Sequence, residues 1–180
     1  MEEEDFLSAE LEIVPAGKAR DLGLDRSMIL AYGQDDRICA FTSLFAMLDM
    51  AEQITDRTLC CLLVDKEEIG SVGATGMQAR FFENTVAELI AATEQDSQLL
   101  VRRALSRSRM LSSDVSAGFD PLYANAFEKK NAAFLAHGLA FNKFTGSRGK
   151  SGSNDANAEY IAKLRKIMDD ANVAYQFSEL

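Results

Sequence analysis

Apolar side chains recur at helical spacing in four stretches of the chain. Spacings of three and four residues place such side chains on one face of a helix. We therefore predict helices over residues 38–54, 78–93, 99–106 and 154–170. Asp35 and Asp36 precede the first of these, as the N-cap and first-turn residues where carboxylates are favoured. In the second helix we predict a core-facing apolar stripe of Phe81, Phe82, Val86, Leu89 and Ile90.

Other apolar stretches have the pattern of strands. Residues 9–14 alternate between apolar and polar side chains before Pro15, as a half-buried strand does. The run over 58–64 is continuously apolar, which is typical of a strand buried on both faces in a parallel sheet. A short apolar run lies at residues 28–32, and shorter strand-like runs lie at residues 110–112, 139–144 and 173–177.

Strands and helices alternate along the chain, which favours an α/β fold. The sequence shows no internal repeat and no long linker, so 180 residues correspond to one domain or part of one. The first and last predicted elements are strands, whereas an α/β sheet usually continues to a helix that covers such a strand. We therefore expect a partial domain.

The composition of the chain argues against several classes of function. A net charge of −9 argues against non-specific nucleic-acid binding, which depends on basic surface. No apolar run approaches the roughly 18 residues that span a bilayer, and the acidic N-terminus is not a secretory signal. Three cysteines do not form a disulfide framework, so we expect a reducing, cytoplasmic compartment. A single histidine excludes a histidine-rich zinc site built from this chain alone.

Acidic side chains collect at the ends of predicted elements. They are Asp35 and Asp36, Glu67 and Glu68 after the apolar run, and Asp114. Ligands of α/β sheets bind at the carboxyl ends of strands, and carboxylates gathered there need a cation or a shared proton. In a bend, one glutamate can bind a metal while its neighbour takes a proton from metal-bound water. The spacing leaves solvated turn residues as the alternative.

The sequence contains GQDDRICAF, DKEEIGSVGATGMQARFFENT, LSSDVSAGFDPLYANAFEKKNAA and NKFTGSRGKSGSNDANAEY. These segments resemble the aspartyl-aminopeptidase-type metallopeptidases, dinuclear zinc aminopeptidases that assemble into tetrahedral dodecamers. The resemblance extends from about Glu3 to Leu180. It implies a three-layer sandwich with helices on both faces of a mostly parallel mixed sheet. Residues 1–30 would end an inserted dimerisation domain and return to the catalytic domain, whose central part would occupy 31–180.

The resemblance also implies roles for single residues. Asp35 would bridge two metal ions, Glu68 and Asp114 would be terminal ligands, and Glu67 would be the general base. The activity implied is metal-dependent removal of N-terminal residues from peptides through a metal-activated water. Zinc is expected, with cobalt or manganese as alternatives. We assign Asp36 no chemistry and expect it to form a local pair with Arg37.

A basic loop follows the predicted strand over 139–144. In the metallopeptidase interpretation, Lys143, Arg148 and Lys150 can meet a substrate carboxylate, which suits an acidic N-terminal residue. A solvated basic loop is the alternative. The partners expected are peptide substrates and further copies of the chain, with neither nucleic acid nor membrane.

The sequence departs from the family in its histidines. The family uses two histidine ligands, one in an upstream His-x-Asp motif and one beyond the last strand seen here. His137 matches neither, and we expect it to be a structural or surface residue. The chain is therefore predicted to be a fragment. The alternative function is that of a catalytically inactive piece with a role in folding or assembly only.

Overall fold

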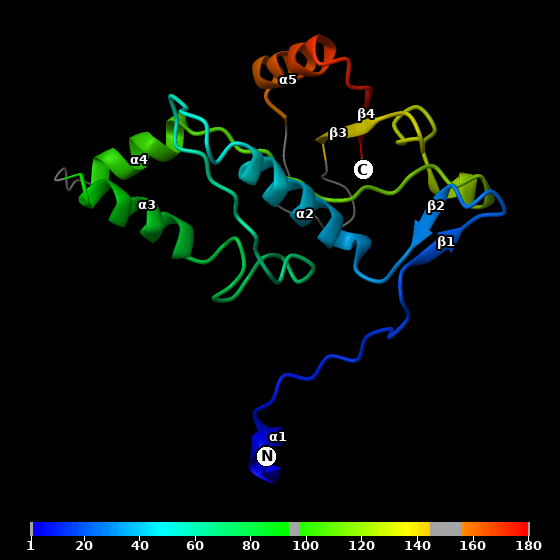
Figure 1. Ribbon diagram of the computed structural model, residues 1–180, viewed down its shortest axis with the longest axis horizontal. Coiled ribbons are helices and arrows are strands. Elements are labelled where there is room, and N and C mark those ends of the chain that lie inside the picture. Colours follow the sequence, from blue (N-terminus) through cyan, green and yellow to red (C-terminus); the bar gives the residue numbers. More distant parts are fainter. Residues whose placement is uncertain (1, 94–97, 145–155, 180) are drawn as a thin grey trace. The chain divides into compact units, whose positions relative to one another are not determined.

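The computed structural model describes residues 2–93, 98–144 and 156–179 (Figure 1). Its contacts divide the chain into two compact units. The first contains Met1–Leu63 together with Leu111–Val115, and the second contains Val64–Met110 together with Ser116–Leu180.

The first unit contains α1 (Glu3–Leu7), a hairpin of β1 (Arg20–Leu22) and β2 (Met28–Leu30), and α2 (Gln34–Asp49). The two strands are antiparallel, with Asp21 opposite Ile29. Residues 9–14 form no strand, so that prediction was wrong. A strand needs a neighbour for its backbone groups, and among the described strands the only pairings are β1 with β2 and β3 with β4.

The helix α2 confirms the first predicted helix but differs at both ends. Its N-cap is Gly33, which has a left-handed φ of 78°. Asp35 and Asp36 lie in the first turn with non-helical backbone angles, joined by a cis peptide bond. The prediction of an aspartate cap was therefore wrong, because the carbonyl of Gly33 accepts the amide of Arg37 at 3.1 Å and starts the helix earlier. The helix ends at Asp49, five residues before the predicted end.

The apolar run over 58–64 is not a strand either. Its described residues have no regular secondary structure, and Leu63 is 57% exposed. The predicted short strand over 110–112 is likewise absent from the described residues. An apolar run can be a buried strand only where neighbouring strands accept and donate its hydrogen bonds, and the described chain offers this run none.

In the second unit, α3 (Phe81–Ala91) and α4 (Gln98–Arg107) contact each other and confirm the second and third predicted helices. The predicted core stripe of α3 is only partly covered. Phe81 is 72% exposed and Leu89 is 58% exposed, while Phe82, Val86 and Ile90 are half-buried. The prediction that Phe81 and Leu89 are core residues was therefore wrong, because no described element covers that side of the helix.

The second unit also contains η1 (Pro121–Ala126), β3 (Leu139–Phe144), α5 (Ala158–Asp170) and β4 (Tyr175–Glu179). Strands β3 and β4 pair with each other in parallel, with Phe141 opposite Phe177, and α5 lies between them in the sequence. The helix lies beside this pair of strands (Figure 1). Leu164 on α5 and Ser178 on β4 are buried. These elements confirm the predicted strand over 139–144, the last predicted helix and, displaced by two residues, the last predicted strand.

Side chains of β4 hold the segment that precedes β3. The side-chain Nε2 of Gln176 donates to the carbonyls of Phe134 at 2.9 Å and Gly138 at 3.1 Å. Its side-chain Oε1 accepts from the Phe134 N–H at 2.8 Å. The Glu179 amide donates to the carbonyl of Asn131 at 2.9 Å. Residue Ser178 donates to Asn142 across the pair. This network fixes the strand pair to the preceding loop.

Together these elements make a partial α/β domain. The described strands form two separate two-stranded sheets. The three-layer sandwich with helices on both faces stays a prediction. All three cysteines are free thiols. In the described part of the chain, no helix combines the length and the apolar character that crossing a bilayer requires.

Replacing Gln176 with leucine keeps the size of the side chain and removes its three hydrogen bonds. We expect the free energy of unfolding to fall by about 2–3 kcal/mol, since each bond contributes about 1 kcal/mol. Urea-induced unfolding measures this change. The control Gln98→Leu, at an exposed position of α4, should stay within about 0.5 kcal/mol of wild type. Equal stability of the two variants would contradict the role given to Gln176.

Candidate metal site

Three carboxylates meet in the first unit. Asp35 and Asp36 come from the first turn of α2, and Asp114 comes from the Leu111–Val115 segment. One oxygen of each lies within 4.8 Å of the others. Asp35 and Asp114 were predicted to be metal ligands, and the structure brings these two together with Asp36.

Asp36 is the residue of this cluster for which no chemical role was predicted. Its Oδ1 atom is buried and has no hydrogen-bond partner among the described residues. The expected partner Arg37 stacks its guanidinium over the ring of Tyr32, 5.5 Å from the ring centre. A buried carboxylate oxygen without a partner is costly, and a cation at the cluster would satisfy it.

Cys39 lies one turn along α2 from Asp36, beside the cluster. Burial, and then the neighbouring Asp36 carboxylate, raise the pKa of its thiol to about 11, against a smaller opposing effect of Ser113. The thiol is therefore protonated near neutral pH. Because it interacts with Asp36 on α2 and with Ser113 on the Leu111–Val115 segment, Cys39 connects the two elements that supply the carboxylates.

The donor set of the cluster fits a divalent cation. Like charges this close repel one another, and the attraction of each carboxylate to a bound cation would outweigh that repulsion. Carboxylate oxygens suit divalent cations such as magnesium, calcium and manganese, and they also serve as zinc ligands. Partial exposure of Asp35 and Asp114 leaves room for an ion to reach them from solvent.

Glu67 and Glu68 lie in a tight turn of the second unit, as the sequence analysis expected from a bend. The carbonyl of Glu67 accepts from the Gly70 amide at 2.8 Å, and the carbonyl of Lys66 accepts from the Ser71 amide at 2.8 Å. Both glutamates are exposed. The structure thus brings three aspartates together in one unit and places the glutamate pair on a turn of the other.

The remaining candidate residues also lie in the second unit. Lys143 is exposed on β3, at the register irregularity between Asn142 and Phe144. Arg148 and Lys150 lie outside the described residues. His137 is exposed, with its ring centre 5.6 Å from that of Phe134. This contact agrees with a structural or surface histidine.

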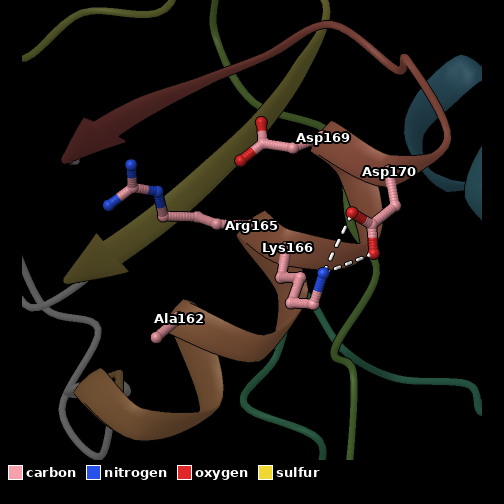
Figure 2. Close-up of a pocket in the computed structure, with 5 residues that line it drawn as sticks. All are labelled: Ala162, Arg165, Lys166, Asp169 and Asp170. Carbon is pink, nitrogen blue, oxygen red and sulfur yellow. Dashed lines mark hydrogen bonds and ion pairs between the residues drawn. The ribbon is translucent and has the colours of Figure 1, made fainter.

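A depression of about 340 Å³ on α5 contains none of these residues (Figure 2). Within it, Lys166 pairs with Asp170 at 2.8 Å, one helical turn away. Asp169 accepts a hydrogen bond from the Tyr175 hydroxyl at 3.1 Å, which ties α5 to β4. The charges of this hollow are thus paired with each other or with the neighbouring strand, as on a solvated helix surface.

The sequence matches one family model over its whole length. Residues 1–180 match the model described as aminopeptidase I zinc metalloprotease (M18). A curated relative, the probable M18 family aminopeptidase 1 of Clostridium acetobutylicum, is 62% identical over 178 residues, which cover 99% of this chain and 38% of the relative. The corresponding protein of Thermotoga maritima is 41% identical over 179 residues, covering 99% of this chain and 39% of that relative.

Solved structures give the same result. The crystal structure of aminopeptidase I from Clostridium acetobutylicum superposes with a TM-score of 0.87 at 60% identity, covering 100% of this chain and 38% of that one. An M18 aminopeptidase structure from Thermotoga maritima superposes with a TM-score of 0.84 at 40% identity, covering 93% of this chain and 37% of that one. The chain therefore spans about two fifths of the length of the relatives it matches.

The unpartnered oxygen of Asp36 gives a prediction for the cluster. In Asp36→Asn, we expect the dissociation constant for zinc, measured by calorimetry, to rise roughly tenfold or more. With a chelator present, the midpoint of thermal unfolding should instead rise, because one of three repelling charges is gone. The control Asp56→Asn, at an exposed loop position, should change neither quantity. Wild-type zinc affinity in Asp36→Asn would remove this residue from the site.

Proposed function

The chain belongs to the aminopeptidase I zinc metalloprotease family (M18), and from this premise we propose that the whole protein removes N-terminal residues from peptides by metal-dependent hydrolysis. The aspartate cluster is the structural observation that supports a metal site at particular residues. A carboxylate set with a buried, unpartnered oxygen is the arrangement that a divalent cation stabilises.

We assign the metal-binding roles as follows. Asp35 would bind both of two ions, while Asp114 and Glu68 would each bind one of them. The proximity of the Asp35 and Asp114 oxygens supports the first two assignments. The position of Glu68 on a turn, next to a second glutamate, supports the third. When bound, zinc supplies a Lewis acid that polarises the scissile carbonyl and makes water a better nucleophile.

Glu67 has a different task in this scheme. Its carboxylate takes a proton from the attacking water and later returns it to the nitrogen of the leaving amine. A general base needs access to the substrate, and the exposure of Glu67 on a tight turn provides it. Adjacent residues in a turn can project differently, so Glu67 can act on protons while Glu68 binds metal.

Zinc is the proposed metal, in a dinuclear site, with cobalt or manganese as substitutes. The family description supports zinc. We further propose that residues 1–30 end an inserted dimerisation domain, that 31–180 form the central part of the catalytic domain, and that the whole protein is a homo-oligomer. A three-layer sandwich completed by the rest of the protein would cover the exposed run over 58–64.

A second function follows from the exposure of apolar side chains. Ala133 and Leu164 are the buried hydrophobic residues of the described chain, whereas large side chains along α2 such as Phe41 and Phe45 are about half exposed. A chain with so little core of its own can act in folding or assembly without catalysis. Metal analysis distinguishes the two functions, since two tightly bound zinc ions in the isolated chain would contradict the assembly role.

The base assignment predicts the behaviour of Glu67→Gln in the whole protein. Turnover of a peptide substrate should be abolished, because the amide cannot accept the proton, while the zinc content stays at the wild-type level. Steady-state kinetics and elemental analysis measure these quantities. The control Glu88→Gln, at an exposed position of α3, should remain fully active. A fully active Glu67→Gln variant would rule out the base assignment.

Substrate preference gives a second prediction. If Lys143 meets a substrate carboxylate, the whole protein should hydrolyse Glu- and Asp-anilides faster than the Leu-anilide. Lys143→Met should then lose this preference chiefly through a higher KM for the acidic substrates, because the lost contact is made in binding. Lys163→Met, at an exposed position of α5, is the control. Equal rates on the three anilides in the wild-type protein would refute the acidic preference.

A further inference from the structure

We propose that Gln78 is a positioning residue that, together with Gly76, holds the turn carrying Glu67 and Glu68. The inference rests on the proposed function, because it concerns the residues to which that function assigns proton transfer and metal binding. The evidence for it is the set of contacts between the turn and the segment just before α3. All of these contacts lie within the second unit.

The turn is closed by backbone hydrogen bonds that converge on Ser71. Its amide donates to the carbonyl of Lys66 at 2.8 Å and to that of Glu67 at 3.3 Å. The backbones of Lys66 and Ser71 are both left-handed, with φ of 63° and 58°. Residues other than glycine rarely adopt this conformation, so surrounding contacts must maintain it.

Gln78 supplies two of those contacts from outside the turn. Its side-chain Nε2 donates to the carbonyl of Gly70 at 2.5 Å, and its backbone amide donates to the carbonyl of Ser71 at 3.0 Å. The side chain thus reaches back eight residues to the point where the turn closes. Outside these bonds Gln78 is exposed, so its substitution leaves the packing of the unit in place.

Gly76 makes the approach possible. A Cβ atom built on this residue would lie 2.2 Å from the carbonyl oxygen of Ser71, well inside contact distance. The glycine is buried against the turn. At the base of the loop, the Asp65 amide donates to the carbonyl of Thr75 at 3.1 Å. The loop from Asp65 to Gln78 is therefore closed at both its base and its tip.

Closure of the turn affects the direction in which the carboxylates of Glu67 and Glu68 project. Glu67 takes part in the turn through its carbonyl, so any opening of the turn rotates the backbone that carries both glutamates. Support residues of metal sites commonly change affinity or activity by roughly 10- to 100-fold when removed. Gln78 has the position for such an effect, although it is not itself a ligand.

The test uses the whole protein and the variant Gln78→Glu, which keeps the shape of the side chain and removes the Nε2 donor. We expect kcat for a peptide substrate to fall roughly 10- to 100-fold with KM near the wild-type value. Hydrogen exchange at the amides of Gly70 and Ser71 should become faster. The control Gln98→Glu should change neither. Gly76→Ala, which separates the same two segments by its added methyl group, should reproduce both effects.

The outcomes separate this inference from the proposed function. Faster exchange with unchanged kcat in Gln78→Glu would show that the contact is structural only and would overturn the positioning role. A lower kcat without faster exchange would overturn the mechanism proposed for it. A wild-type protein without peptidase activity would defeat the proposed function, and the exchange data would still decide whether Gln78 holds the turn.

Discussion

Repulsion between carboxylates is the constraint on which the candidate site depends. Two like charges 4 Å apart repel by about 1 kcal/mol in water and by about 4 kcal/mol near a protein surface. Asp35, Asp36 and Asp114 approach within 4.8 Å of one another, and they come from two segments far apart in the sequence. The packing of α2 against Leu111–Val115, in which Cys39 takes part, has to hold these charges together. A bound cation removes the repulsion, so cation binding and the local stability of the first unit are coupled.

Four of the described helices could be predicted from the sequence, whereas only β3 and β4 among the four described strands could. A helix satisfies its own backbone hydrogen bonds, so the apolar spacing of α2, α3, α4 and α5 was sufficient evidence for them. A strand takes its hydrogen bonds from a neighbour. The strand predictions at β3 and β4 are confirmed because these two strands pair with each other inside this chain. The runs over 9–14 and 58–64 have equally good strand patterns, but the described chain contains no neighbour that pairs with them.

The candidate site was predictable to a similar degree. Asp35 and Asp114 lie at the ends of predicted elements, which is a local property, and the family resemblance assigned them metal-binding roles. Asp36 was missed because its role depends on the approach of the Leu111–Val115 segment, a tertiary contact. Its place beside Asp35, just before the helical apolar pattern, was the available signal. The contact of Gln78 with the turn that carries Glu67 and Glu68 could not be predicted either. It depends on a backbone path through two left-handed residues that are not glycine.

The donors at the cluster also bear on the choice of metal. Three carboxylates form a hard oxygen set, which suits magnesium, calcium or manganese at least as well as zinc. Zinc sites usually include nitrogen or sulfur ligands. The Cys39 thiol lies beside the cluster, and burial followed by the Asp36 carboxylate raises its pKa. The ring of His137 lies against that of Phe134, with ring centres 5.6 Å apart. If zinc binds at this cluster, nitrogen or sulfur donors from elsewhere in the protein would complete its ligand set, and the aspartates would supply negative charge.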